Sequence, residues 1–167
     1  LVNLGSTKGY IFDEVYYVDG ARDLLKYGVE VSGSNPEFIV HPPVGKWLIG
    51  GGIAIFGDNE FGWRFATALI GTLLILVFAR LVHVLFYSPL LTGLGAALMA
   101  MDGLLLVHSR TALLDLFLTF FVLIALLLWH RGRHWWAGLA FGLALGCKWS
   151  AIYFIVAIAL VSLYRIL

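Results

Sequence analysis

Charged residues are scarce in this chain of 167 residues, where Asp, Glu, Lys and Arg together make up 13% of the sequence. Ordinary soluble domains contain about 25% charged residues and roughly 45 to 50% apolar ones. Here the apolar share is 61% and the mean hydropathy is +0.94. The composition therefore excludes an ordinary soluble domain and predicts a protein that is embedded in a lipid bilayer.

Cysteine is almost absent, and so are the common motifs of soluble enzymes. The single cysteine, Cys147, excludes an internal disulfide framework and a cysteine-based zinc cluster, and its apolar surroundings predict that it is buried. The sequence contains no HExxH, GxGxxG, Walker or EF-hand spacing. We therefore expect neither soluble nucleotide chemistry nor a nucleic-acid partner.

The few charges are segregated along the chain. Residues 1–60 contain eight acidic and four basic residues, a net charge of −4, whereas residues 61–167 contain two acidic and seven basic residues, a net charge of +5. This division predicts an acidic extracytoplasmic loop with short surface helices over residues 1–60 and a transmembrane helix bundle over residues 61–167. Because the chain starts at Leu1 without methionine and stops in an apolar stretch, we expect a piece of a longer protein.

Apolar runs in the second part predict about five membrane spans. A helix needs about 20 mostly apolar residues to cross a hydrocarbon core of about 30 Å, and residues 62–86, 89–107 and 111–129 meet this requirement directly. Residues 135–166 are too many for one ordinary span and contain Lys148 in the middle. We therefore favour two helices with a break near Lys148 over one long tilted helix.

A stripe of small residues marks the first of these two helices. Gly138, Gly142 and Gly146 are spaced four residues apart, which lets another helix backbone come close. The spacing predicts that this helix lies in the interior of the bundle.

The acidic loop has elements of its own. Residues 17–26 have helical character and residues 28–36 are typical of a loop. Residues 46–57 are apolar but too short to cross the bilayer, so we expect them at its surface or packed under the polar head. His41 precedes two prolines, which predicts a rigid, non-helical corner; that corner is either purely structural or part of a site.

Basic residues in short loops favour the cytoplasm and so set the orientation. Arg80 begins the loop of residues 80–89, the loop of residues 130–135 is rich in basic residues, and Arg165 ends the last span. With these inside, residues 1–60 lie outside. Ionisable residues then converge on that outer face: Arg64, Arg110, Asp115 and Lys148.

Charges within membrane spans are costly and usually line a site, a wet cavity or a structural pair. Arg64 and Arg110 either reach for lipid headgroups or bind an anion, and Asp102 is either a structural partner of Arg110 or part of a site. Asp115, one turn into its predicted helix, is favoured there by the helix dipole alone. Lys148 has no acid nearby in sequence, which favours phosphate binding at a helix break.

Two adjacent carboxylates, Asp13 and Glu14, stand among apolar residues in the first loop. Their mutual repulsion requires that one keeps its proton or that a cation lies nearby. The apolar neighbours predict that at least one of the two acids points inward and is used chemically. A positioned carboxylate that accepts the proton of a hydroxyl nucleophile accelerates such a reaction by about 10² to 10⁴, and fixed cations stabilise a phosphate leaving group.

Four segments, in this order and spacing, resemble the protein O-mannosyltransferases, a family of polytopic membrane glycosyltransferases of the GT-C type: FDEVYYVDGARDLL, HPPVGKWLIG, GWRFATALIGTL and MDGLLLVHSRTALLDLFLTFF. The stretch GLALGCKWSA, which contains the break at Lys148, is similar to the Gly-rich stretch of that family that ends in Lys-Trp. The resemblance runs through nearly the whole chain. It implies an all-α polytopic membrane protein with the GT-C helix bundle.

The resemblance also implies a reaction. The family takes mannose from a polyprenyl (dolichyl-type) phosphate and attaches it to Ser or Thr hydroxyls of secreted proteins on the outer or lumenal side. Asp13 matches the general base, Glu14 its neighbour that shapes the acceptor site, and Arg64 a basic position that the family needs. Nothing is implied for His41 beyond its place in the HPPxGK segment.

Several expectations follow for the surroundings of this reaction. Arg64, Lys148 and Arg110 are expected to bind the donor phosphate, and His41, Asp102 and Asp115 to support the site. A single positioned base fits one-step inversion. We expect no cofactor and no metal, although Asp13, Glu14 and His41 together offer possible ligands.

Two further expectations concern the family segments that are missing from this chain and the membrane in which the protein lies. Compared with the family, the helix before the acidic loop and the second half of the bundle are missing, so the fragment alone is expected to be inactive. A dimer is possible. The Leu, Ala and Gly-rich spans favour a bacterial plasma membrane with an extracytoplasmic site, or the ER membrane in a eukaryote.

Two other functions stay open at this point. A different GT-C transferase would use the same kind of donor but add the sugar to a lipid or a glycan. A transporter or non-catalytic membrane subunit would use the buried charges to line a path or hold a partner. Transporter repeats should show paired interrupted helices in two related halves, whereas this sequence shows one interruption, near Lys148.

Overall fold

The structure is a computed structural model that describes residues 2–32, 35–36 and 40–166. These residues are almost entirely helical. The elements are α1 (Glu14–Tyr27), β1 (Val31–Ser32), β2 (Asn35–Pro36), α2 (Val44–Phe56), α3 (Glu60–Phe86), α4 (Pro89–Met101), α5 (Gly103–His108), α6 (Leu114–His130), α7 (His134–Cys147) and α8 (Ala151–Ile166).

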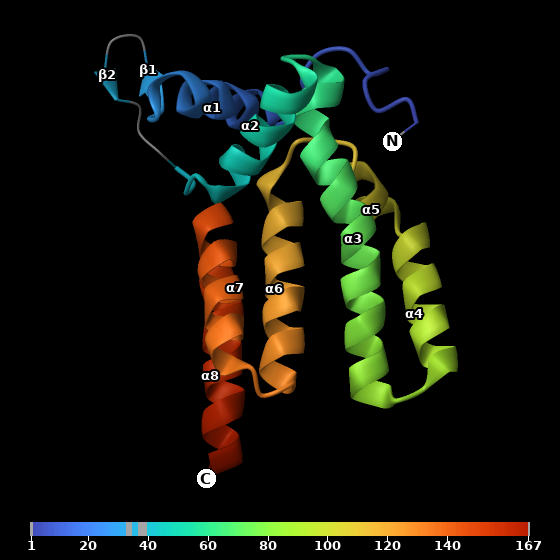
Figure 1. The fold of residues 1–167 in the computed structure, drawn as a ribbon. Coiled ribbons are helices and arrows are strands. Elements are labelled where there is room, and N and C mark those ends of the chain that lie inside the picture. The colour runs from blue at the N-terminus through green and yellow to red at the C-terminus, as the bar shows by residue number, and fades with distance from the viewer. Residues whose placement is uncertain (1, 33–34, 37–39, 167) are drawn as a thin grey trace.

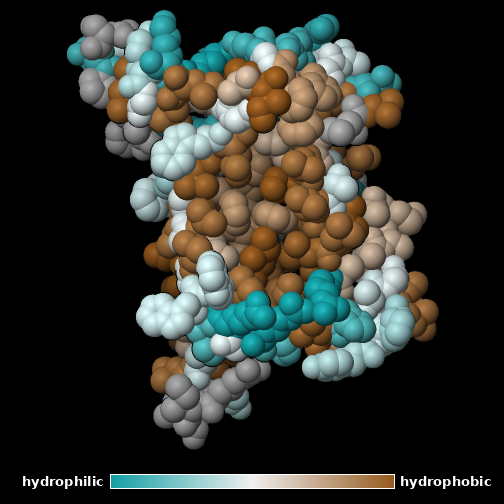
Figure 2. Space-filling model, viewed as in Figure 1, coloured by the Kyte–Doolittle hydropathy of each residue, from teal (hydrophilic) through white to brown (hydrophobic). Residues whose placement is uncertain are grey.

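The helices form two layers. Figure 1 shows α1 and α2 lying across one end of a set of roughly parallel and antiparallel helices, α3, α4, α6, α7 and α8. We call the layer of α1 and α2 the cap. Figure 2 shows apolar side chains over the middle of the face in view and polar ones at both ends, the distribution that a bilayer requires. The division of the chain at residue 60 stays a prediction.

Helix length agrees with the predicted spans in part. Within the described residues, α3 is the one helix that is both long and apolar enough to cross a membrane, and it covers the predicted residues 62–86. Helices α4 and α6 are apolar but shorter, as is the described apolar part of α8, Ala151–Tyr164. The break near Lys148 is confirmed, because α7 ends at Cys147 and α8 begins at Ala151.

Two boundaries differ from the predictions. Residues 89–107 are not one helix, because the carboxylate of Asp102 accepts a hydrogen bond from the amide of Leu105 at 2.7 Å and caps a new helix, α5. The predicted loop 28–36 contains the antiparallel pair β1–β2, in which Val31 faces Pro36. In both cases a local hydrogen-bonding pattern divides a segment that composition alone presents as uniform.

The core lies where the cap meets the bundle. Phe117 and Leu114 of α6 are fully buried there beside Ile49 of α2, and Cys147 is buried in the same cluster as predicted. Burying one such large apolar side chain contributes about 1.5 to 3 kcal/mol relative to leaving it in water. This cluster fixes the cap on the end of the bundle.

The glycine stripe of α7 makes a helix contact at one of its three positions within the described residues. Helix α7 packs on α6 through buried alanines, Ala137, Ala140 and Ala144. A side chain added at Gly138 or Gly142 would meet nothing within 4 Å, and only Gly146 lies against another element, at Val44 of α2. Alanine, not glycine, therefore carries the close approach within the part of the chain that the structure describes.

Candidate functional site

A buried ion pair joins the cap to the bundle. Glu14, at the start of α1, and Arg64, in the first turns of α3, are both completely buried. The guanidinium donates from Nε to Oε1 and from Nη2 to Oε2 of Glu14, each at 2.8 Å. Such a bidentate, charge-assisted arrangement is the strong form of an Arg–carboxylate contact. Arg64 is thus the nearby cation that the adjacent acids require.

Further hydrogen bonds complete this cluster. Glu14 also accepts from the amides of Ile11 at 2.9 Å and Ala112 at 2.8 Å. Arg64 donates to the carbonyl oxygens of Thr7 at 2.7 Å and Gly9 at 2.8 Å. Four chain segments therefore meet at one ion pair. In this position Arg64 faces Glu14 and backbone carbonyls, so the phosphate-binding role expected of it has no support from the contacts it makes.

The neighbouring acid, Asp13, points in another direction. Asp13 immediately precedes α1, makes no side-chain capping hydrogen bond, and lines a cavity of about 510 Å³ next to Tyr17 and His41. Four carboxylates line this cavity. Three of them have a partner: Asp19 pairs with Arg22, Glu30 pairs with Lys46, and Asp23 accepts a hydrogen bond from the amide of Val31. Asp13 has no ion-pair partner among the described residues.

Tyr17 stands between Asp13 and His41. It lies one helical turn after Asp13 and its ring centroid is 5.9 Å from that of His41. Burial, followed by the negative charges of Asp13 and Asp115, raises the pKa of Tyr17 to about 12. The phenol therefore keeps its proton at neutral pH and can act only as a neutral hydrogen-bonding group.

His41 occupies the corner before α2 and also lines the cavity. Burial lowers the pKa of His41, and the positive charges of Lys148 and Lys46 lower it further, against the weaker opposite effect of Asp115 and Asp13. The ring is therefore neutral at pH 7. Its Nδ1 atom is buried and has no hydrogen-bond partner among the described residues.

The predicted break in the last apolar run holds a second ion pair. The Lys148 ammonium donates to both carboxylate oxygens of Asp115, at 2.7 and 2.9 Å, although 33 residues separate them in sequence. This pair is only half-buried, in contrast to the pair of Glu14 and Arg64. Lys148 thus has the acid that the sequence did not show, and about a quarter of its side chain stays exposed.

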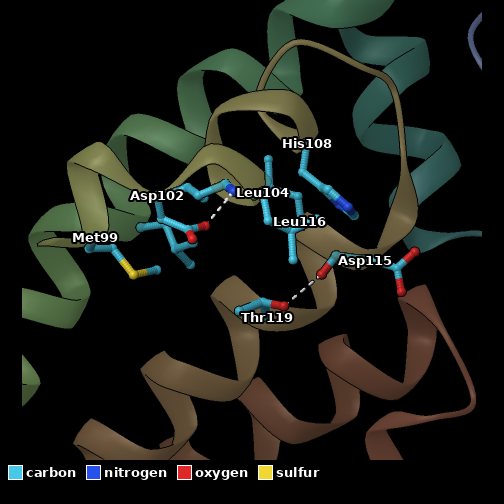
Figure 3. A pocket seen from close by; sticks show the side chains of 9 residues that line it. Met99, Asp102, Leu104, His108, Asp115, Leu116 and Thr119 are labelled. Atoms are coloured by element: carbon cyan, nitrogen blue, oxygen red, sulfur yellow. Dashed lines mark hydrogen bonds between the residues drawn. The ribbon is translucent and has the colours of Figure 1, made fainter.

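Asp115 also borders a second pocket, of about 360 Å³, between α5 and α6 (Figure 3). Figure 3 shows Asp102, His108 and Thr119 around this pocket, with the carboxylate of Asp115 turned away from Asp102. Asp102 bonds to the Leu105 amide. The rest of the pocket lining is apolar, and among its polar groups Asp102 caps α5, Asp115 pairs with Lys148 and Thr119 donates to the Asp115 carbonyl.

Arg110 does not pair with Asp102, in contrast to one of the expectations. Its guanidinium donates to the carbonyl oxygens of Val2 at 3.3 Å and Asn3 at 2.9 Å. Arg110 therefore fixes the N-terminal segment to the α5–α6 turn. The seven residues between Asp102 and Arg110 are the short helix α5 and the start of a turn, so Asp102 and Arg110 do not lie on the continuous helix on which the expected pairing depended.

Sequence reasoning did not identify two features of this region. Tyr17 could have been found, because it follows Asp13 by four residues, the spacing that places side chains on one helix face. The buried ion pair of Lys46 and Glu30 gave no signal, because it joins α2 to the residue just before β1. Both features belong to the cavity that Asp13 lines.

The chain is similar to known proteins over most of its length. The family profile described as dolichyl-phosphate-mannose-protein mannosyltransferase matches residues 40–166. The chain belongs to this family. Residues 1–39, which include Asp13 and Glu14, lie outside that match.

Individual members of the mannosyltransferase family are similar over almost the whole chain. A polyprenol-phosphate-mannose–protein mannosyltransferase of Mycobacterium tuberculosis is 41% identical over 92% of this chain and 36% of its own length. One of the same name from Mycolicibacterium smegmatis is 34% identical over 97% of this chain and 38% of its own length. An undecaprenyl phosphate-α-4-amino-4-deoxy-L-arabinose arabinosyl transferase of Pseudomonas aeruginosa is 35% identical over 78% and 24%, respectively.

The chain thus spans a little over a third of the length of the mannosyltransferases that it matches. No solved structure matches it. The suspected membership of the protein O-mannosyltransferases is confirmed by these comparisons.

Proposed function

We propose that the protein to which this chain belongs transfers mannose from polyprenol phosphate mannose to Ser or Thr hydroxyls of secreted proteins. The observation that carries the proposal is the state of Asp13. It lines the cavity with neither an ion-pair partner nor a backbone N–H donor among the described residues, whereas Asp23 accepts from the Val31 amide and Glu14 is buried against Arg64. A carboxylate in that state is available to accept a proton.

The proposed step is a single displacement. Asp13 accepts the proton of the acceptor hydroxyl while the hydroxyl oxygen bonds to the anomeric carbon of mannose. The bond from that carbon to the phosphate oxygen breaks, and polyprenyl phosphate leaves with the electron pair. One base and no second positioned nucleophile fit inversion of the anomeric centre.

Lys148 is the cation that we assign to the leaving phosphate. It lies at the break between α7 and α8, close enough to His41 to lower the pKa of that residue. In the absence of donor the ammonium is neutralised by Asp115. A phosphate that reaches the exposed side of Lys148 would gain charge stabilisation that increases as the bond to the sugar breaks.

We further propose that the cap faces the extracytoplasmic side of a bacterial plasma membrane. The support is the positive-inside rule: the loop between α6 and α7 contains Arg131 and Arg133 and lies at the end of the bundle opposite the cap (Figure 1). Substrates would then reach Asp13 from the side on which secreted proteins emerge.

Metal independence is part of the same proposal. Glu14, one of three possible ligands, directs both of its oxygens at Arg64 and backbone amides, so it would have to abandon these contacts to bind a metal. Transfer measured in membranes should keep its rate when a chelator is added. A loss of rate that added Mg²⁺ or Mn²⁺ restores would contradict this part.

The test of the main proposal uses membranes that contain the intact gene product. Labelled polyprenol phosphate mannose is supplied with a Ser/Thr-rich peptide, or with the same peptide in which alanine replaces each Ser and Thr. We expect label in the first peptide only. Asp13→Asn should lower the rate by about 10² to 10⁴, the usual contribution of a positioned base, with unchanged membrane insertion.

Asp58→Asn is the matched control. Asp58 is an acid of the same region outside the cavity, and its exposed ion pair with Arg22 contributes at most about 1 kcal/mol. It should therefore keep the wild-type rate. Equal rates for Asp13→Asn and the wild type would remove Asp13 from the mechanism.

A second candidate function has one specific observation in its favour, the similarity to the arabinosyl transferase of Pseudomonas aeruginosa. On that alternative the sugar goes to a lipid or a glycan. Label that appears only in the lipid fraction of the same experiment would favour it over protein mannosylation.

A further inference from the structure

The two ring nitrogens of His41 have different surroundings. Nδ1 is enclosed and has no partner among the described residues. Nε2 makes no hydrogen bond to a described residue and is not among the buried atoms without a partner, and the ring lines the cavity. Nδ1 is thus the enclosed nitrogen, and we infer that Nε2 faces the cavity.

This difference decides where the proton of the neutral ring lies. A neutral imidazole has one N–H donor and one acceptor nitrogen. An enclosed N–H without an acceptor is among the rarest features of folded proteins. The favourable tautomer therefore keeps Nδ1 unprotonated and places the hydrogen on Nε2, where a ligand can accept it. A second proton would have to enter the dry Nδ1 position, which agrees with the lowered pKa of His41.

Both sides of His41 are held in place. Before it, the carbonyl oxygen of Val40 accepts a hydrogen bond from Nε1 of Trp149 at 3.1 Å. After it, Pro42 and Pro43 restrict the backbone and lead into α2. Trp149 is the neighbour of Lys148 in the break between α7 and α8, so a single contact keeps the corner of His41 beside the lysine.

We propose that His41 donates a hydrogen bond from Nε2 to an oxygen of the donor phosphate, beside Lys148, and so acts as a neutral partner of that cation. The proposal rests on the proposed mannosyl transfer and extends it to the leaving group. Lys148 supplies the charge. His41 supplies direction, because its backbone is restrained on both sides and its ring lies against Tyr17 with Nδ1 enclosed.

Two polar variants separate the nitrogens. In His41→Gln the side-chain amide can place an N–H near the position of Nε2, whereas in His41→Asn it reaches only the position of Nδ1. The intact gene product in membranes should keep its turnover within about tenfold in His41→Gln. His41→Asn and His41→Leu should lose about 10- to 100-fold, the usual effect of removing a hydrogen bond to a charged group.

A donor analogue tests the phosphate directly. Replacing one non-bridging phosphate oxygen of polyprenol phosphate mannose with sulfur weakens the acceptor of the proposed bond. In the wild type, one of the two diastereomers should react more slowly than the natural donor by about tenfold. In His41→Leu the same diastereomer should show no further loss, because the bond is already absent. A residue that acts only through folding would leave the sulfur effect unchanged.

The outcomes separate the two proposals. Equal rates for His41→Gln and His41→Asn, or a full sulfur effect in His41→Leu, would overturn the role of His41. Coupling of His41 to a deoxymannose donor instead of the sulfur donor would overturn the phosphate assignment in favour of a sugar hydroxyl. The proposed function fails separately, through the Ser/Thr peptide and Asp13→Asn, neither of which involves His41.

Discussion

Replacing Arg64 with methionine would remove a buried guanidinium and keep an unbranched side chain in its place. Glu14 would then be left without its two guanidinium hydrogen bonds at a position with 0% exposure. Breaking a buried ion pair on one side costs about 3 to 5 kcal/mol. At 1.4 kcal/mol per factor of ten, the folding equilibrium should shift by about 100- to several-thousand-fold.

Unfolding of the intact gene product in detergent micelles, followed by tryptophan fluorescence, would measure this change. Trp63, next to Arg64, is buried and reports on the junction. The double variant Glu14→Gln with Arg64→Met should lose less than Arg64→Met alone, because it leaves no unpaired buried charge. Arg110→Met serves as the control: its guanidinium contacts are exposed, so the stability should change by about 0.5 kcal/mol or less.

One result would refute this reasoning. If Arg64→Met unfolds like the wild type but needs a much higher concentration of polyprenol phosphate mannose for half-maximal rate, Arg64 binds the donor phosphate. The expectation drawn from the sequence would then be right and the structural interpretation of the ion pair wrong.

Three further predictions concern the site and its surroundings. Lys148→Met should slow mannosyl transfer by about 10² to 10³, the effect of losing one charge-stabilising donor. Asp115→Asn leaves the lysine charge in place and should slow transfer less. Steady-state transfer rates in membranes would compare the two variants. Phe12 and Tyr87 have similar left-handed backbones (φ 54° and 50°) and are 81% and 78% exposed, so Phe12→Gly and Tyr87→Gly should each keep the wild-type stability or gain up to about 1 kcal/mol. Phe12 precedes the proposed base, so only Phe12→Gly should slow transfer. Equal transfer rates for the two variants would contradict a role of Phe12 in positioning Asp13. Folding lowers the pKa of His41 below its usual 6.5, so just below that pH the unfolded chain binds more protons than the folded one. The free energy of unfolding should therefore fall as the pH drops below about 6.5. Unfolding curves at several pH values should show a smaller fall for His41→Gln than for the wild type.

Some of the fold could be predicted because lipid is a demanding solvent. The break at Lys148 followed from the cost of an ammonium in an apolar run, and the structure places it there. The break at Asp102 did not follow, because residues 89–107 satisfy the length and composition of a span. What divides them is one hydrogen bond from Asp102 to the amide of Leu105, a local choice that average hydropathy does not record.

The site was predictable as a set of residues and not as a set of roles. Adjacent acids in an apolar context indicated that one points inward, but the sequence could not decide which. The structure assigns the inward position to Glu14 because Arg64 and the amide of Ala112 meet it there, and it leaves Asp13 at the cavity. Contacts across so many residues arise from tertiary packing, which one sequence does not reveal.

The reach of Glu14 also sets an order for biogenesis. One of its partners, Arg64, is translated 50 residues later, and another, the Ala112 amide, 98 residues later. A nascent chain that stops before residue 112 therefore lacks one of the hydrogen bonds to Glu14, and α1 gains this last partner only when the ribosome has supplied the α5–α6 turn. Protease protection of α1 in chains arrested before and after residue 112 would show this delay as a late gain of resistance.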